Sequence, residues 1–339
     1  MTALAELLLA SKMRWRRRKY LLRAFRRRHE LRPVYDRTRQ IGRDDILVFA
    51  TMRNESIRLP YYLDHYRKMG VSHFLIVENN SDDTTQSYLA AQPDVSVWTT
   101  SASYKASRFG VDWLNWLQNK YGRGHWCLTV DADEILVLPC DEDRNLRDLT
   151  NWLDQRGQPF FAATMLDMYP KTTLSTAKYT PGTPPQSAIP WFDPWGYTWE
   201  LQTKHQNISI RGGVRKRLFF QDNPNHAPHM HKTPLIRWKR GYTYASSTHL
   251  ALPRHLNRGY DARLNSPTGV LLHSKFLNVV VEKSSEELSR REHFTYSERY
   301  DDYYQSLIDD PILWDETSMH FAGWEQLEQV GLFTRGDWT

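Results

Sequence analysis

The order of short apolar runs between residues 45 and 136 constrains the fold of this chain more than any other feature. Four runs are separated by segments in which apolar residues recur at helical spacing, with turn or capping residues at the borders. The runs are DILVFA at 45–50, HFLIVE at 73–78, DVSVW at 94–98 and HWCLTV at 125–130. Because crossovers between such strands are right-handed, we expect an α/β fold: a Rossmann-like, mostly parallel sheet with helices on both faces.

Polar clusters follow three of these runs, at the points where the strands should end. Arg53, Asn54 and Glu55 come after the first run, the segment 78–83 follows the second, and the segment 131–134 follows the fourth. The carboxyl ends of parallel strands meet at one edge of such a sheet, and ligands bind there. We therefore expect the three clusters to converge on one site.

Asp131 and Asp133 are separated by a single residue, directly after an apolar run. On an extended chain such positions point to the same side. Two neighbouring carboxylates repel each other unless a cation lies between them. A carboxylate pair with open coordination positions is a typical way to share Mg²⁺ or Mn²⁺ with the phosphates of a substrate. The pattern therefore predicts a site for Mn²⁺ or Mg²⁺ and a diphosphate.

Three motifs in a fixed order resemble those of a known family. ATMRNES, VENNSDDTT and TVDADEIL occur in this order, with strand–helix spacing between them. Over residues 45–290 the sequence resembles the family 2-type glycosyltransferases of the GT-A fold, in the branch whose motifs are R-N-E, D-N-x-S-x-D-x-T and D-x-D-E. One departure is Glu78, which stands where the family usually has Asp. The resemblance implies a nucleoside diphosphate sugar as donor and leaves the nucleotide open.

The resemblance also implies roles for the matching residues. Those expected to bind the nucleotide sugar are Thr51, Arg53, Asn54, Glu55, Glu78, Asn79, Asp83, Asp131 and Asp133. Within this set, Glu78 and Asp83 would approach the base and the ribose. Asp131 would bind the ribose or the donor sugar, and Asp133 would ligate the metal. A tight turn followed by a helix N-cap would equally explain Asn79, Ser81 and Asp83.

Other candidate residues are spread over the chain. Arg108, at the start of a predicted helix, either reaches the donor or lies on the surface. Transferases of this kind commonly use a late histidine as a further ligand of the metal or diphosphate. His249 and His273 are therefore the candidate metal ligands, although either could be structural. The cluster HAPHMHK has no acid or cysteine beside it and is interpreted as a loop.

The catalytic base is expected downstream of the carboxylate pair. Asp193 is the first choice, with Asp167 and Glu200 behind it. Asp193 lies in the aromatic segment WFDPWGYTW, which is predicted to form either a lid over the acceptor or a cluster packed on itself. The segments GGVRKRLFF, HKTPLIRW and YASSTHLAL are predicted to be short strands.

The basic character of the chain is concentrated at its start. Residues 1–40 carry 13 Lys and Arg against three acidic residues, a net charge of +10, whereas the whole chain carries +6. Read as a helix that Pro33 ends, this segment has a stripe formed by Leu4, Leu8, Trp15, Leu22 and Phe25. Such a helix can dock on its own domain, lie on an anionic membrane surface, or contact another subunit. No nucleic acid partner is expected.

The composition indicates the cellular compartment in which the protein is expected. The two cysteines form no C-x-x-C pair, which fits a reducing compartment and suggests neither a disulfide framework nor a zinc site. The sequence contains no run of 18 apolar residues, so no membrane-spanning helix is expected. The cations follow the N-terminal apolar run, the opposite of the order in a secretory signal. We expect a cytoplasmic protein, with peripheral attachment to the inner membrane face as one option.

Three parts are expected: a basic amphipathic helix at 1–40, a GT-A glycosyltransferase domain at 41–290, and a helical tail at 291–339 packed on that domain. The expected function is the metal-dependent, inverting transfer of a sugar from a nucleoside diphosphate to a hydroxyl of a glycan or lipid-linked glycan. One alternative is a non-catalytic, membrane-associated scaffold that kept the fold. The other is a sugar nucleotidyltransferase, which would normally have a Gly-rich loop where this chain has ATMRNES.

Overall fold

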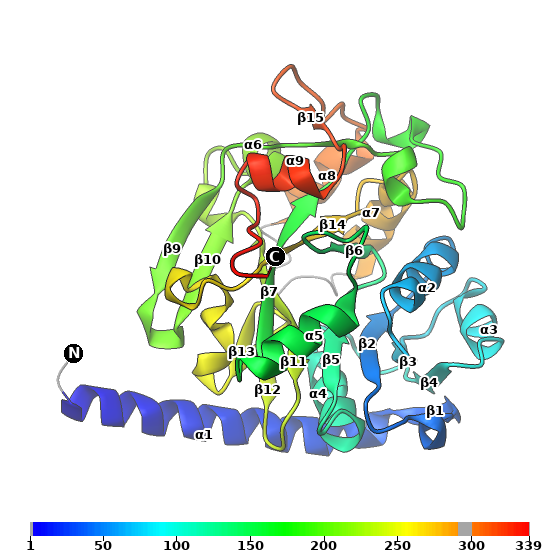
Figure 1. The fold of residues 1–339 in the computed structure, drawn as a ribbon. Coiled ribbons are helices and arrows are strands. Elements are labelled where there is room, and N and C mark those ends of the chain that lie inside the picture. Colours follow the sequence, from blue (N-terminus) through cyan, green and yellow to red (C-terminus); the bar gives the residue numbers. More distant parts are fainter. Residues whose placement is uncertain (1–2, 291–299, 339) are drawn as a thin grey trace.

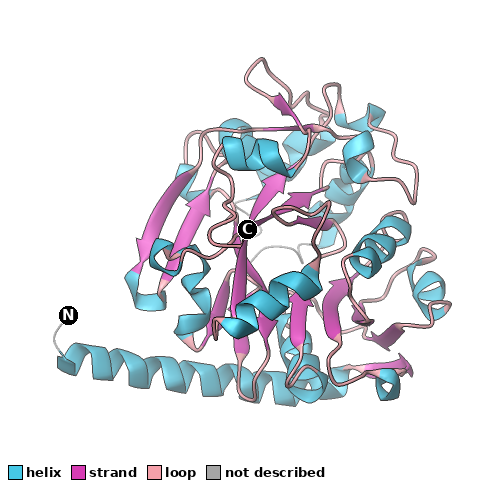
Figure 2. Cartoon of the chain, in the orientation of Figure 1, coloured by secondary structure: helices cyan, strands magenta, loops and turns pink. Residues whose placement is uncertain are grey.

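The computed structural model describes residues 3–290 and 300–338. Within these residues the main sheet has nine strands in the order β1-β4-β3-β2-β5-β11-β7-β14-β6, and helices cover both of its faces (Figures 1 and 2). One direction is shared by β2 (Ile46–Met52), β3 (His73–Glu78), β4 (Val95–Thr99), β5 (Trp126–Thr129), β7 (Phe160–Asp167) and β14 (Gly269–His273). The opposite direction is taken by β1 (Arg32–Tyr35), β6 (Glu134–Val137) and β11 (His231–Arg237). The α/β class and the mostly parallel sheet expected from the sequence are confirmed.

Two hydrophobic layers, one on each face of the sheet, hold the helices in place. Side chains alternate along β2, so Ile46, Val48 and Ala50 face one layer while Leu47 and Phe49 face the other. The first layer also contains side chains of α2 (Leu59–Lys68), α3 (Thr85–Ala90) and α5 (Leu146–Gln155), and the second those of α4 (Val111–Tyr121). Burial on both faces explains why β2 reads as an unbroken apolar run.

Helix α1 (Ala3–Arg27) lies across α4 along the lower side of the molecule in Figure 1. It ends before Pro33, and residues 32–35 form β1, which pairs with β4 at the edge of the sheet. Part of the segment 1–40 therefore belongs to the sheet. Met13 and Ala24 of α1 are buried, whereas the predicted apolar stripe is exposed. No helix in the described ranges is long and apolar enough to cross a membrane.

The second half differs from the sequence-based prediction at two places: the tail predicted to be helical contains the strand β15 (Met319–His320), and one predicted strand is a helix. GGVRKRLFF forms helix α6 (Gly213–Phe219) and not a strand. Val214 and Arg215 are neighbours and both are buried, whereas a half-buried strand turns neighbouring side chains to opposite faces. The other described α-helices and strands are β8 (Trp191–Phe192), β9 (Thr198–Gln202), β10 (Asn207–Arg211), β12 (Thr243–Ser246), β13 (Leu250–Leu252), α7 (Val279–Arg290), α8 (Asp301–Ile308), β15 (Met319–His320) and α9 (Trp324–Gln329).

The C-terminal region packs on the body of the molecule. Leu327, Phe333 and Trp338 join the first hydrophobic layer, and α8 contacts α7. Residues 291–299 and 339 of the predicted tail lie outside the described residues. In the aromatic segment WFDPWGYTW, Phe192 is buried but Trp195 and Trp199 are exposed.

Candidate active site

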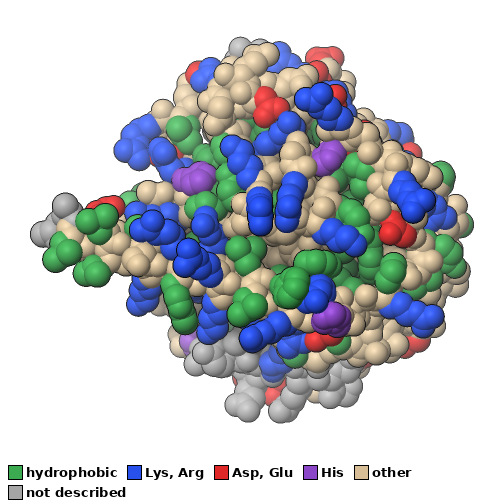
Figure 3. All heavy atoms as spheres, turned by 90° about the horizontal axis from the view of Figure 1, so that it is seen from below, with side chains coloured by type: hydrophobic (Ala, Val, Ile, Leu, Met, Phe, Trp, Pro, Cys, Tyr) green, Lys and Arg blue, Asp and Glu red, His purple; other side chains and the backbone are tan. Residues whose placement is uncertain are grey.

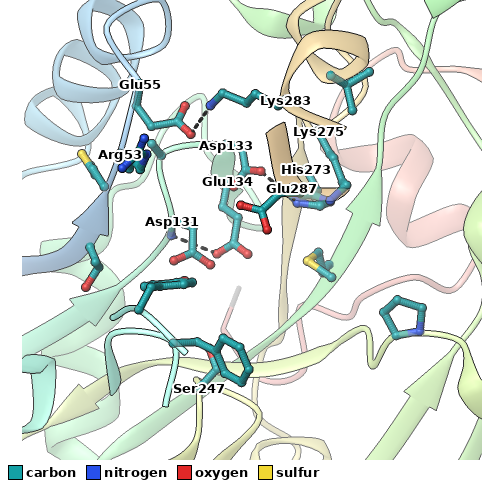
Figure 4. A pocket seen from close by; sticks show the side chains of 18 of the residues that line it. Arg53, Glu55, Asp131, Asp133, Glu134, Ser247, His273, Lys275, Lys283 and Glu287 are labelled. Atoms are coloured by element: carbon teal, nitrogen blue, oxygen red, sulfur yellow. Dashed lines mark hydrogen bonds and ion pairs between the residues drawn. The ribbon is translucent and has the colours of Figure 1, made fainter. Parts of the chain in front are cut away.

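A large cavity lies where the winding of the sheet changes direction. Strand β2 has β3 on one side and β5 on the other, so the chain winds away from β2 both ways. This is the switch point at which ligands of doubly wound sheets bind. A cavity of about 600 Å³ opens there, next to the carboxyl ends of β2 and β5 (Figure 4).

Most of the residues named from the sequence meet in this cavity. Its lining includes Thr51, Arg53, Asn54, Glu55, Asn79, Arg108, Asp131, Asp133, His249 and His273. Among the described residues, the lining does not include Glu78, Asp83, Asp167, Asp193 or Glu200. The three motif clusters thus converge as the sequence predicted, while the candidate bases lie elsewhere.

The segment after β5 forms an acidic cluster. Asp131, Asp133 and Glu134 each offer a carboxylate oxygen, and these oxygens lie within 4.8 Å of one another. Lys232 of β11 forms ion pairs with the buried Glu134 and, at 3.3 Å, with Asp131. Burial opposes the charge of Lys232, but Glu134 and Asp131 raise its pKa above the ordinary value. A protonated lysine therefore already offsets part of the negative charge.

His273 connects the acidic cluster to a buried ion pair. Its Nε2 lies 3.1 Å from Asp133, and its Nδ1 donates a 2.6 Å hydrogen bond to Asp167. Asp167 also accepts a 2.7 Å hydrogen bond from Arg215. Although burial opposes ionisation, Arg215 and His273 hold the pKa of Asp167 at about 2. Burial likewise opposes the ionisation of Asp133, but His273 lowers its pKa well below the ordinary value.

The loops after β2 and β3 fasten each other beside the cavity. The side chain of Asn54 accepts a hydrogen bond from the backbone of Asp82, and Asp83 accepts one from the backbone of Ser56. Asp83 also accepts from the N–H of Thr85 in the first turn of α3, and the side chain of Glu78 accepts from the N–H of Ser81. Glu78 and Asp83 thus have the turn-forming contacts that the composition of this segment allowed.

Helix α7 closes one side of the cavity through two ion pairs. Glu286 lies 2.9 Å from Arg53, and Lys283 lies 2.6 Å from Glu55. Glu287, also on α7, points toward the acidic cluster in Figure 4. The R-N-E motif therefore contacts a helix more than 200 residues away in the sequence.

The segment before α4 has an unusual backbone. Arg108, Phe109 and Gly110 have φ values of 57°, 60° and 75°, all in the left-handed region. A Cβ atom at Gly110 would lie 2.5 Å from Oγ1 of Thr51, so only glycine fits there. Arg108 donates a 2.9 Å hydrogen bond to the buried Asp112, and its guanidinium lies 4.2 Å from the ring of Tyr20 on α1. Strained backbone and paired charge together fix Arg108 at the cavity wall.

The remaining candidates occupy different surroundings. Asp193 is buried and pairs with Arg217 at 2.8 Å and with the hydroxyl of Tyr169. Glu200 lies exposed in the hairpin of β9 and β10. His249 donates a 2.6 Å hydrogen bond from Nδ1 to the carbonyl of His231, which leaves Nε2 as an acceptor. Burial and the neighbouring Lys232 lower the pKa of His249 well below 6.5.

Sequence reasoning missed several cations of the cavity. They are Arg58, Arg215, Lys232, Lys275 and Lys283. A lysine inside the predicted strand HKTPLIRW was a signal that the sequence did contain. Lys275 makes no ion pair or hydrogen bond within the described part of the chain, and its Nζ lies 5.7 Å from the ring of Tyr303. Burial and the nearby Arg215 lower its pKa to about 8.

The donor set suits a hard divalent cation. The side chains of Asp131 and Asp133 are 50% and 25% exposed, whereas that of Glu134 is 1% exposed and held by Lys232. Carboxylate oxygens with open positions beside them are the ligands that Mg²⁺ and Mn²⁺ prefer. The hydrogen bond to Asp167 orients the imidazole of His273, as partners outside the coordination sphere orient metal-binding histidines. The residues present therefore fit Mn²⁺ or Mg²⁺.

Comparison with known proteins yields weak similarities. No protein-family model and no curated protein matches the sequence. A solved 4-diphosphocytidyl-2C-methyl-D-erythritol synthase matches with 17% identity over 41% of this chain and 66% of its own, at a TM-score of 0.25. HddC from Yersinia pseudotuberculosis matches with 9% identity over 64% of this chain and 80% of its own, at a TM-score of 0.27. UTP-bound UGPase from Acinetobacter baumannii matches with 10% identity over 78% of this chain and 99% of its own, at a TM-score of 0.29. Neither a shared fold nor a shared activity follows from scores this low.

Proposed function

We propose that this protein is a glycosyltransferase that moves a sugar from a nucleoside diphosphate to a hydroxyl of a glycan or lipid-linked glycan. The observation that supports this most is the position of Asp131 and Asp133. Both carboxylates face a cavity at the switch point of the sheet, where a nucleotide is expected to bind. The motifs that resemble family 2 glycosyltransferases line the same cavity, and the likeness implies inversion at the anomeric carbon.

The donor would lie between the acidic cluster and the cations. Asp133 and His273 would hold Mn²⁺ or Mg²⁺, and Asp131 would bind the ribose or the donor sugar. A bound cation would neutralise charge on the departing diphosphate. Lys275, which has no ion pair of its own in the described part of the chain, would add a positive charge beside the same phosphates. The loop 51–55 and Asn79 would border the nucleotide, and Arg108 would approach the donor from the segment before α4.

A base is needed to take the proton of the acceptor hydroxyl. Asp193 and Asp167, the candidates chosen from the sequence, are held by Arg217 and Arg215 and are not among the described residues that line the cavity. Glu287 lines the cavity and points toward the acidic cluster (Figure 4). We therefore assign the base to Glu287 and give Asp167 the task of orienting His273.

A donor panel tests this function. UDP-, GDP-, CMP- and dTDP-sugars should be titrated into the protein with Mn²⁺ and again with EDTA, and binding followed by calorimetry. One nucleotide sugar should bind with Mn²⁺ only, Asp133→Asn should lose that binding, and Glu287→Gln should keep it while losing transfer. Donor binding that ignores both EDTA and Asp133→Asn would refute the metal assignment. Pyrophosphate release from a nucleoside triphosphate and a sugar 1-phosphate would instead identify a nucleotidyltransferase.

A further inference from the structure

The outer face of α1 is exposed and carries both large apolar and basic side chains. Its large apolar side chains are Leu4, Leu7, Leu8, Trp15, Leu22 and Phe25, each between 48% and 68% exposed. At about 100° per residue, Leu4, Leu8, Trp15 and Leu22 fall within roughly 40° of one another around the helix. Exposed cations on the same face are Lys12, Arg14, Arg18, Lys19 and Arg26. Figure 3, which looks at the molecule from this side, shows hydrophobic and basic side chains intermingled along the helix and few acidic ones.

The opposite face of α1 is fastened to the body. Met13 packs in a buried cluster with residues of β12 and β13, and Ala24 is 2% exposed. Arg23 donates hydrogen bonds of 3.0 and 3.1 Å to Asp112, which is fully buried, and Arg27 lies 3.8 Å from the same carboxylate. These contacts fix the rotation of the helix about its axis. The exposure of the outer face is therefore set by the fold and does not result from fraying of the helix.

A partner that covers this face must accept its apolar side chains and also pair with its cations. A second copy of the chain would bring its own arginines and lysines against these, and like charges repel. A nucleic acid would pair with the cations but would leave Leu4, Leu8 and Trp15 without apolar contacts. The interface of an anionic bilayer satisfies both, because acyl chains receive the apolar side chains while headgroups pair with the cations.

We propose that the outer face of α1 is a docking surface for an anionic lipid bilayer. The cationic surplus is local, since residues 1–40 carry +10 and the whole chain +6, which leaves −4 for the rest. Docking therefore has a defined orientation: attraction acts at α1, and the body of the protein faces away from the headgroups.

The same helix supports the wall of the cavity. The ring of Tyr20 packs against the guanidinium of Arg108, and Met13 clusters with Ala245; both Arg108 and Ala245 line the cavity. If the acceptor is lipid-linked, which rests on the proposed function, docking would place this cavity beside the membrane that carries it. The docking itself does not depend on any enzymatic activity.

Vesicle sedimentation tests the proposal with the full-length protein. Vesicles of phosphatidylcholine alone and of phosphatidylcholine with phosphatidylglycerol should be compared at low and high salt. The protein should sediment with the anionic vesicles at least about tenfold better than with the neutral ones, and salt should release it. The double variant Leu8→Glu/Trp15→Glu should lose at least about tenfold in affinity. Trp199→Glu is the matched control, because Trp199 on β9 is 71% exposed and lies outside α1.

Three results would overturn the proposal. The first is equal sedimentation with both kinds of vesicle, and the second is unchanged binding by the double variant. The third is a dimer, detected without lipid by sedimentation velocity, that the double variant dissociates, because a second copy would then cover this face. Donor titrations of the double variant separate this from the proposed function: normal Mn²⁺-dependent donor binding with lost vesicle binding supports docking alone.

Discussion

Replacing Asp167 by Asn should weaken both the fold and the site. The side chain of Asp167 is 0% exposed and that of its partner Arg215 is 5% exposed, and the two lie 2.7 Å apart. Removing one member of a buried pair leaves the other charge uncompensated and typically costs about 3–5 kcal/mol. Asparagine keeps one acceptor oxygen, so we expect a loss near the lower end, about 3 kcal/mol.

A matched control separates burial from charge pairing. Asp64 and Lys68 form an ion pair of 2.8 Å, but their side chains are 52% and 76% exposed. Asp64→Asn should therefore change the free energy of unfolding by about 0.5 kcal/mol or less. Urea unfolding followed by tryptophan fluorescence measures both variants. Adding Arg215→Met to Asp167→Asn should recover part of the loss, because the unpaired guanidinium is then gone.

The site provides a second readout of the same substitution. Asp167 accepts the Nδ1 hydrogen bond of His273, so Asp167→Asn should lower Mn²⁺-dependent donor affinity by about 10- to 100-fold, as loss of an orienting partner does in metal sites. Equal unfolding free energies for Asp167→Asn and Asp64→Asn would refute the argument from burial. Unchanged donor affinity in the folded variant would remove Asp167 from the orienting role.

Two further predictions follow from histidines in different surroundings. His273→Ala should reduce Mn²⁺-dependent donor binding far more than His249→Ala. The reason is that His273 lies beside Asp133, whereas Nδ1 of His249 lies 2.6 Å from a backbone carbonyl. Near-normal donor titrations of both variants would show that both histidines have structural roles. Burial lowers the pKa of His65 from 6.5 to about 4. As the pH drops, this histidine therefore takes up a proton in the unfolded chain before it does so in the folded protein. The free energy of unfolding should accordingly fall between about pH 6.5 and pH 4. His65→Gln should flatten that decline by up to about 3 kcal/mol in urea unfolding at several pH values, and an unaltered pH profile would count against the assignment.

The sequence predicted the sheet and one side of the site because both depend on local patterns. The strand His73–Glu78 has an apolar run, 74–77, at its centre and turn residues after it, and its predicted bounds match the observed ones. Asp131 and Asp133 line the cavity because they directly follow a strand that ends there. The convergence of the motif loops follows from parallel strands sharing one edge.

What the sequence could not predict depends on partners far along the chain. Nothing near Asp193 or Asp167 indicates that Arg217 and Arg215 neutralise them, because both arginines lie on α6, which the sequence pattern placed in a strand. Lys232 reaches the acidic cluster from a strand about 100 residues downstream. The sequence left open whether the apolar stripe of α1 packs on its own domain. In the structure the stripe is exposed and Met13 and Ala24 are buried, because Arg23 and Arg27 turn toward Asp112.

The left-handed backbone at Arg108 and Phe109 has a consequence for how related chains should diverge. Each non-glycine residue in that region costs about 1 kcal/mol or more, a cost that Gly or Asn would largely remove. At 109, selection for stability alone would therefore drift toward Gly or Asn, whereas at 108 the ion pair with the buried Asp112 opposes that drift. A lineage that carries Gly or Asn at 108 should therefore also replace Asp112, whereas one that keeps Asp112 should retain arginine despite the strain.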